Sequence, residues 1–114
     1  MEDCIFCKIV AGTIFSRKVF EDNWTFAFHD VQPQTPTHVL IIPKQHFFNL
    51  EALADADQLL LGHLMHTVTI IAKQEHLSKE GYRVAINCGS WGGQLVQHLH
   101  IHLLGGRKLT DGLG

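Results

Sequence analysis

In the stretch from Gln97 to Leu104, apolar and polar residues alternate strictly between His98 and Leu103. A period of two is typical of a β-strand with one buried face, because successive side chains point to opposite faces of a sheet. The residues predicted to face the core are Leu99, Ile101 and Leu103. The opposite face would carry a row of histidines, His98, His100 and His102. Neighbouring members of this row would lie roughly 7 Å apart, twice the rise per residue of a strand.

The rest of the chain predicts a sheet with two helices. Further strands are expected over 17–21, 24–30, 38–43 and 82–88, and the apolar run 38–43 suits a central strand buried on both faces. Apolar residues at steps of three and four predict a long amphipathic helix from Asp55 to Leu77, with Asp55 and Gln58 resembling a capping box. A short helix is expected over 4–10, ending near Gly12. Strands and helices do not alternate, so the predicted class is α+β, with about five mostly antiparallel strands in one domain, residues 1–114.

Composition excludes some classes of protein. The formal net charge is −2, so no basic excess suggests nucleic-acid binding. We expect neither a signal peptide nor a membrane span, because no long apolar run is present. Three cysteines do not make a disulfide framework, which favours a reducing, cytoplasmic location. Nine histidines in 114 residues are the unusual feature.

A Cys-x-x-Cys pair, Cys4 and Cys7, lies near the start of the chain. Two thiolates at this spacing can bind one Zn²⁺, but a structural site needs four ligands, and His46 and His98 are the candidates for the others. Redox chemistry is an alternative, although no thioredoxin-like βαβ pattern surrounds the pair. Two buried core cysteines are a third interpretation, and the residues alone leave it as open as the metal site.

A glycine-rich segment, residues 89–94, directly precedes the histidine row. Successive backbone amides in such a segment can bind an anion, although a plain connection between two strands has the same composition. The spacing matches neither a Walker loop nor a dinucleotide fingerprint. Its position before three histidines favours a phosphate site.

The histidine row itself is compatible with two chemistries. Three imidazoles can hold a catalytic zinc ion. Alternatively, the middle imidazole, that of His100, can act as a nucleophile that its two neighbours support. The row contains no carboxylate that could orient a metal-bound histidine, which favours the nucleophile.

Several motifs together resemble one family. The segment 98–104 fits the histidine-triad pattern, in which three histidines alternate with apolar residues, at every position. The other matching segments are Cys4–Ile9, Phe26–Asp30, Pro33–His38, Ile42–Lys44, Gly92–Gln94 and Leu104–Arg107. Over nearly its whole length the chain is similar to the Hint-like branch of the histidine-triad (HIT) proteins.

The resemblance implies a fold and an activity. The expected fold is the HIT-like fold, dimerising edge to edge into one ten-stranded sheet. The expected substrate is a purine nucleoside 5′-phosphate derivative. Hint-like proteins hydrolyse adenosine 5′-phosphoramidates to AMP and an amine through a nucleotidyl-histidine. Two alternatives are a dinucleoside polyphosphate hydrolase and a nucleotide-binding regulatory module with weak turnover.

The resemblance also assigns residues to roles. His100 would be the nucleophile, and His102 would hold the phosphate together with the amides of Gly93 and neighbours such as Gln94. His38 would orient the row, Asn87 would contact the phosphate or ribose side, and Asp30 would accept the ribose hydroxyls. The positions around the purine would be Phe6, Ile9, Ile14, Phe28, His29 and Val31. A structural zinc would be held by Cys4, Cys7, His46 and His98, and would fix the strand that aims His100.

Two features depart from the family pattern. Leu95 stands where phosphoramidases often carry a small hydroxyl residue near the leaving group, and leucine cannot donate a hydrogen bond. The tail after Arg107 is short and lacks aromatic residues, so the substrate preference of relatives is not transferable.

Overall fold

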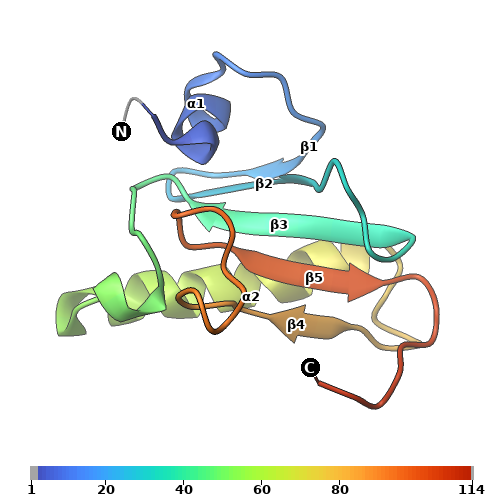
Figure 1. The fold of residues 1–114 in the computed structure, drawn as a ribbon. Coiled ribbons are helices and arrows are strands. Elements are labelled where there is room, and N and C mark those ends of the chain that lie inside the picture. The colour runs from blue at the N-terminus through green and yellow to red at the C-terminus, as the bar shows by residue number, and fades with distance from the viewer. Residues whose placement is uncertain (1–2, 114) are drawn as a thin grey trace.

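Five strands form one antiparallel sheet in the order β1-β2-β3-β5-β4 (Figure 1). The computed structural model describes residues 3–113, so residues 1, 2 and 114 of the expected domain lie outside the described part. The strands are β1 (Lys18–Glu21), β2 (Thr25–His29), β3 (Thr37–Pro43), β4 (Arg83–Ala85) and β5 (Ile101–Gly105). The predicted α+β class and the central place of the 38–43 run are confirmed.

The short helix α1 (Ile5–Ala11) lies one residue later at each end than the predicted 4–10, and it stops at Gly12 as expected. Cys4 is its N-cap, and the sulfur of Cys4 accepts a hydrogen bond from the backbone N–H of Cys7. Gly12 ends the helix in the left-handed conformation, with φ of 82°. A residue with a Cβ adopts that conformation only at a cost, which explains why the helix stops at a glycine.

The long helix α2 spans Gln58–Gln74, shorter at both ends than the predicted 55–77. At its start Asp57 accepts a hydrogen bond from the N–H of Ala54 (2.8 Å), so the expected Asp55–Gln58 capping box is wrong. Two 3₁₀ turns, η1 (Leu50–Ala52) and η2 (Asp55–Asp57), precede the helix.

At the other end of α2, His76 takes the left-handed conformation with φ of 61°. The N–H groups of His76 and Leu77 donate to the carbonyls of Lys73 and Ala72, as in a Schellman motif. The helix therefore ends three residues before the predicted Leu77. Within residues 3–113, no helix combines the length and apolarity needed to cross a membrane.

The sheet carries a different cluster of apolar side chains on each face. On the face covered by α2, Val68 and Ile71 pack with Val39, Ile41 and Ile101, all nearly without solvent exposure. On the other face, α1 packs through Phe6 and Ile9. Figure 1 shows the two helices on opposite sides of the sheet. The strand partners of α1 are Phe26, Phe28, Leu40 and Ile42.

The strand of the histidine row begins at Ile101 rather than Gln97. Before that point the backbone bonds elsewhere, because the N–H of Leu99 donates to the carbonyl of Phe47 at 2.7 Å. The alternation of faces nevertheless persists, with Leu99 in the α2 cluster and His98 against Phe6. The predicted strand over 82–88 is likewise reduced to the three residues of β4.

The outer edge of β1 carries charge and an irregularity. Glu21 pairs with Lys18 (3.1 Å) and with Lys44 (2.7 Å) at this edge. The register between β1 and β2 also shifts between Lys18 and Phe20. Charged side chains and bulges are the devices by which proteins keep an exposed strand from pairing with another chain.

Candidate active site and metal centre

The sheet brings together two histidines that are 64 residues apart in the chain. His38 lies on β3 and His102 on the neighbouring strand β5, where the pairing places His38 opposite Leu104 and Leu40 opposite His102. The Nε2 of His38 lies 2.9 Å from the Nδ1 of His102, a hydrogen-bond distance.

The hydrogen bonds around these two rings determine where their protons lie. The backbone N–H of Gln34 donates to the Nδ1 of His38 at 3.1 Å, so that nitrogen must offer a lone pair. In a neutral imidazole the proton is then on Nε2, which donates to the Nδ1 of His102. The proton of His102 is therefore on its own Nε2. The three groups form a relay that ends in an N–H donor.

The ring of His100 is held in the opposite tautomer. Its Nδ1 lies 2.7 Å from the backbone carbonyl oxygen of His98, and only an N–H can donate to a carbonyl. The lone pair of His100 is therefore on Nε2. Phe6 contacts this ring edge-on with centroids 5.2 Å apart, and the ring of His102 lies 5.0 Å away. The Nε2 lone pair of His100 can attack an electrophilic atom, while the Nε2–H of neighbouring His102 can donate to an oxygen on that atom.

Burial keeps the relay neutral near pH 7. It lowers the pKa of His38, an effect that Asp30 opposes and that His100 adds to. Burial also lowers the pKa of His102 to about 4, with further lowering from His100 and His38 and an opposing effect from Asp30. Neutral rings can accept one hydrogen bond and donate another, as the relay requires.

Asp30 lies beside the relay, with its Oδ2 3.5 Å from the Nε2 of His38, while its Oδ1 accepts from the N–H of Gln32. Asp30, His38 and His102 are close enough to hold a metal ion. The tautomers argue against a metal ion here. The lone pair of neutral His38 is on Nδ1, and it already accepts a hydrogen bond from the N–H of Gln34. We interpret this trio as a hydrogen-bonded relay.

A second cluster lies at the other end of the row and has the composition of a zinc site. The side chains of Cys4, Cys7, His46 and His98 place one ligand atom each within 4.8 Å of all the others. The Nδ1 of His98 lies 3.3 Å from the sulfur of Cys4 and 3.1 Å from the Nδ1 of His46. Zinc bonds of about 2.0–2.3 Å in a tetrahedron separate ligand atoms by roughly 3.3–3.8 Å, so the spacing fits.

The tautomer of His98 supports the same interpretation. The fully buried ring of His98 donates from Nε2 to the carbonyl of Pro43 (2.9 Å), so its Nδ1 lone pair faces the cysteines. Burial lowers its pKa to about 4, and burial also lowers the pKa of His46. The Nδ1 of His46 lies 3.1 Å from the Nδ1 of His98, so it can serve as a second nitrogen ligand of the same ion. Because His98 faces the cysteines, the row does not converge on one metal ion, which argues against the three-histidine zinc site.

The two thiols share a partly buried environment. Burial and a hydrogen bond with Cys4 raise the pKa of the Cys7 thiol when no ion is bound. A zinc ion lowers the pKa of coordinating thiols and takes them as thiolates. The donor set therefore fits zinc chemically as well as geometrically.

The glycine-rich segment is built around Gln94, which is buried. Its side-chain oxygen accepts from the N–H of Gly89, and its amide nitrogen donates to the carbonyls of Phe48 and Val96. A Cβ at Gly92 would lie 2.5 Å from the carbonyl oxygen of Cys88, and Gly93 has a φ of 80°. Both N–H groups of the Gln94 side chain are used by these carbonyls, and the backbone N–H groups of Gly93 and Gln94 donate to the carbonyls of Ser90 and Gly89. Binding an anion here therefore requires these turn hydrogen bonds to open.

The other expected binding residues lie around α1 and β2. Phe6, Ile9 and Phe28 belong to the buried α1 cluster, and Ile14 packs against it. His29 is half-buried, whereas Val31 and Leu95 are both more than nine-tenths exposed. Asn87 donates from its amide to the carbonyl of Gly92, at the base of the loop. Sequence reasoning missed Gln34, because its contribution is a backbone N–H.

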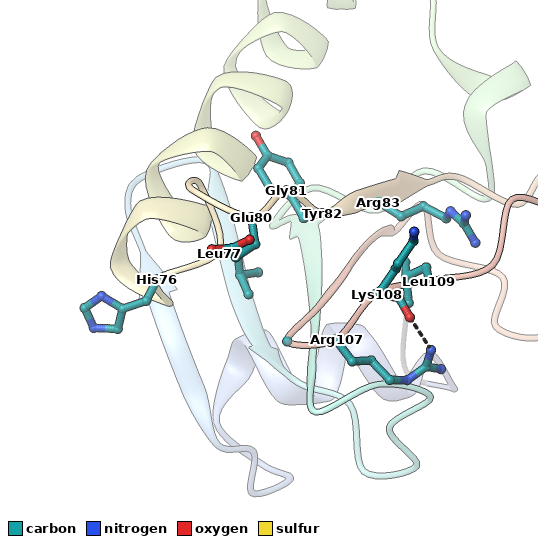
Figure 2. Close-up of a pocket in the computed structure, with 10 residues that line it drawn as sticks. His76, Leu77, Glu80, Gly81, Tyr82, Arg83, Arg107, Lys108 and Leu109 are labelled. Carbon is teal, nitrogen blue, oxygen red and sulfur yellow. Dashed lines mark hydrogen bonds between the residues drawn. The ribbon is translucent and has the colours of Figure 1, made fainter.

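A groove of about 570 Å³ lies away from the histidine row (Figure 2). It runs between the segment after α2, the start of β4 and the turn after β5. Its cationic residues are Arg83, Arg107 and Lys108. The guanidinium group of Arg83 donates to the backbone carbonyl of Thr110. That of Arg107 donates to the carbonyls of Gln34 and Lys108.

Residues 11–109 match the HIT domain. An uncharacterized HIT-like protein of Synechococcus elongatus is 56% identical over 109 residues, covering 96% of this chain and 95% of the relative. A 14 kDa zinc-binding protein of Zea mays is 48% identical over 109 residues, covering 93% and 84%.

Solved structures agree with this assignment. A HIT family hydrolase from Legionella pneumophila superposes with a TM-score of 0.96 and is 46% identical, covering 98% of this chain and all of that one. A histidine triad nucleotide-binding protein from Candida albicans has a TM-score of 0.82 and 34% identity, covering 98% and 87%. The fold, the histidine row and these matches together lead to one conclusion: the chain belongs to the HIT family.

Proposed function

We propose that the protein hydrolyses adenosine 5′-phosphoramidates, or closely similar purine nucleoside derivatives, to the nucleoside monophosphate and an amine. The observation that carries the proposal is the pair of opposite tautomers, with a lone pair on the Nε2 of His100 and a proton on the Nε2 of His102. The similarity to a HIT family hydrolase and to a histidine triad nucleotide-binding protein supports the substrate class.

The reaction has two displacements. The Nε2 of His100 attacks the α-phosphorus, a P–N bond to the ring forms, and the P–N bond to the amine breaks. Solvent protonates the leaving amine, because Leu95 offers no hydroxyl. Water then attacks the phosphorus and releases a proton to solvent, the bond to His100 breaks, and the monophosphate leaves. His102 donates from Nε2 to a phosphate oxygen in both steps and stabilises the charge there.

The remaining roles belong to the same proposal. The backbone N–H groups of Gly93 and Gln94, which donate to carbonyls of their own turn in this structure, turn to the phosphate oxygens when substrate binds. Asn87 supports the loop that carries them, and His38 keeps His102 oriented. Asp30 accepts the ribose hydroxyls. The purine lies among the side chains around α1, β2 and the segment after it: Phe6, Ile9, Ile14, Phe28, His29 and Val31.

A zinc ion on Cys4, Cys7, His46 and His98 would have a structural task. It would bind the Nδ1 atoms of His46 and His98 and so hold the segment whose carbonyl orients His100. We also propose a homodimer joined through the free edge of β4, because the edge of β1 is charged and irregular.

The test is a substrate panel with trapping of the covalent adduct. Adenosine phosphoramidate, diadenosine polyphosphates and AMP are offered to the wild type, to His100→Gly and to His66→Asn. His66 is an exposed histidine on α2 and serves as the control. We expect an acid-labile nucleotidyl adduct and phosphoramidate turnover in the wild type and His66→Asn, and neither in His100→Gly, with zinc content unchanged throughout.

Three other outcomes would point elsewhere. Faster turnover of diadenosine polyphosphates would assign the chain to the alternative hydrolase. Tight AMP binding with no turnover of any adenylate would indicate a binding module, for which exposed Leu95 provides a reason. Turnover that survives His100→Gly would remove the proposed nucleophile.

A further inference from the structure

Arg107 follows β5 and contacts the loop that precedes β3. Its Nη2 donates to the carbonyl of Gln34 at 3.3 Å, and its Nη1 donates to the carbonyl of Lys108 at 3.1 Å. Figure 2 shows the bond to Lys108 at the margin of the groove. The guanidinium group thus links the turn after β5 to a loop that is 73 residues away in the chain.

Gln34 is the residue whose N–H fixes the tautomer of His38. Its loop needs support, because residues 31–34 are all exposed and water competes for their backbone groups. Side chains supply the bonds that hold this loop: Thr35 donates to the carbonyl of Thr37, and Asp30 accepts from the N–H of Gln32. The hydrogen bond from Arg107 to the carbonyl of Gln34 ties this loop to the turn after β5.

A second contact brings the same two segments together. Gly106 has a φ of 93°, and a Cβ there would lie 2.9 Å from the Cβ of Pro36 and 3.3 Å from the N of Thr37. The turn after β5 therefore packs against the loop at a distance that only glycine permits. This close approach is independent of the Arg107 hydrogen bonds and places Arg107 beside Gln34.

We propose that Arg107 is a positioning residue, which acts on the histidine row through Gln34 and His38. By holding the carbonyl of Gln34, it keeps the N–H of Gln34 on the Nδ1 of His38. That bond keeps the proton of His38 on Nε2, and the proton of His102 on the Nε2 that faces the phosphate. The catalytic consequence rests on the proposed function, but the tautomers can be measured without any substrate.

The experiment compares three variants with the wild type: Arg107→Met, Arg107→Lys and the control Lys108→Met. Lys108 is the neighbouring exposed cation, and among residues 3–113 its side chain makes no hydrogen bond to the Gln34 loop. Long-range ¹H–¹⁵N correlation spectra report which nitrogen of each imidazole carries the proton. Zinc content and thermal unfolding verify that each variant is folded, and kcat and KM are measured with adenosine phosphoramidate.

We expect a single tautomer of His38 and of His102 in the wild type and in Lys108→Met, and mixed tautomers of both rings in Arg107→Met. The kcat of Arg107→Met should fall by about tenfold with KM nearly unchanged, as is usual when an orienting group is lost. Arg107→Lys keeps a cation and a donor, so it should recover part of both effects.

Two outcomes would overturn the positioning role. One is an Arg107→Met protein whose tautomers match those of Lys108→Met. The other is a fall in kcat without any change of tautomer, which would mean that Arg107 acts by another route. A wild type without turnover would contradict the proposed function, while the tautomer comparison would still decide the role of Arg107.

Discussion

The carbonyl oxygen of His98 accepts a hydrogen bond from the Nδ1 of His100 at 2.7 Å, and the ring of the same His98 lies in the Cys–His cluster. One residue therefore belongs to both centres of the site. Its side chain faces the thiols, while its backbone fixes the tautomer of the proposed nucleophile. Anything that moves the ring of His98 will change the aim of His100, although no metal needs to take part in the reaction.

Replacing either thiol should release zinc. We expect about one zinc ion per chain in the wild type and a large loss in Cys4→Ser and Cys7→Ser, because a structural site needs all four ligands. Loss of an ion present at 100 times its Kd costs about 2.7 kcal/mol of stability. Metal analysis and urea unfolding measure both effects. Cys88→Ser is the matched control, since Cys88 lies outside the cluster, and equal zinc loss in this variant would contradict the site.

Stability should fall as the pH falls from 6.5 towards 4. Burial, followed by His100 and His38, lowers the pKa of His102 to about 4 in the folded protein, against an ordinary value of 6.5. Between these two values the unfolded chain binds more protons than the folded one, so the free energy of unfolding rises with pH. The contribution of His102 is present in full above pH 6.5 and is lost towards pH 4.

The measurement is urea unfolding at several pH values for the wild type, His102→Gln and the exposed-site control His66→Gln. The free energy of unfolding of His102→Gln should depend less steeply on pH than that of the wild type. Asp30 raises the pKa of His102 and so reduces the expected difference in slope. Identical slopes for all three proteins would mean that the ring of His102 titrates normally in the folded state.

Two glycine-to-alanine changes should have opposite effects. Gly92→Ala places a Cβ 2.5 Å from a backbone carbonyl oxygen, so the loop must deform, at a cost of about 1–3 kcal/mol. Gly62 lies inside α2 with nothing within 4 Å of its Cβ position. Gly62→Ala should therefore stabilise the protein by about 0.5–1 kcal/mol. Urea unfolding measures both effects. An unchanged free energy of unfolding in Gly92→Ala would show that the loop is not held as described.

The alternation around the histidine row predicted its faces but not its length. Leu99, Ile101 and Leu103 are buried against α2 as expected, because the period of two sets the face wherever the chain is extended. The strand starts later than predicted because the N–H of Leu99 bonds to Phe47. That partner lies in a connection without any periodic pattern, so the sequence contained no signal for it.

Local sequence patterns could not predict which residues far apart in the chain come into contact. The Cys-x-x-Cys spacing marks a possible metal site, but the convergence of His46 and His98 depends on how β3 and the row lie together. The contact of His38 with His102 depends on strand register. The contribution of Gln34 is a backbone N–H, which any residue except proline could supply, so residue identity gives no information about it.

The charged, bulged margin formed by β1 has a consequence for assembly. In the proposed homodimer each copy has one open margin, β4, and one blocked margin, β1, so a second copy is added at β4 only once. The resulting pair would present two β1 margins outward, and neither would accept another strand. Growth by strand addition would therefore stop at two copies, and a fibre built through this sheet would be prevented without any further element.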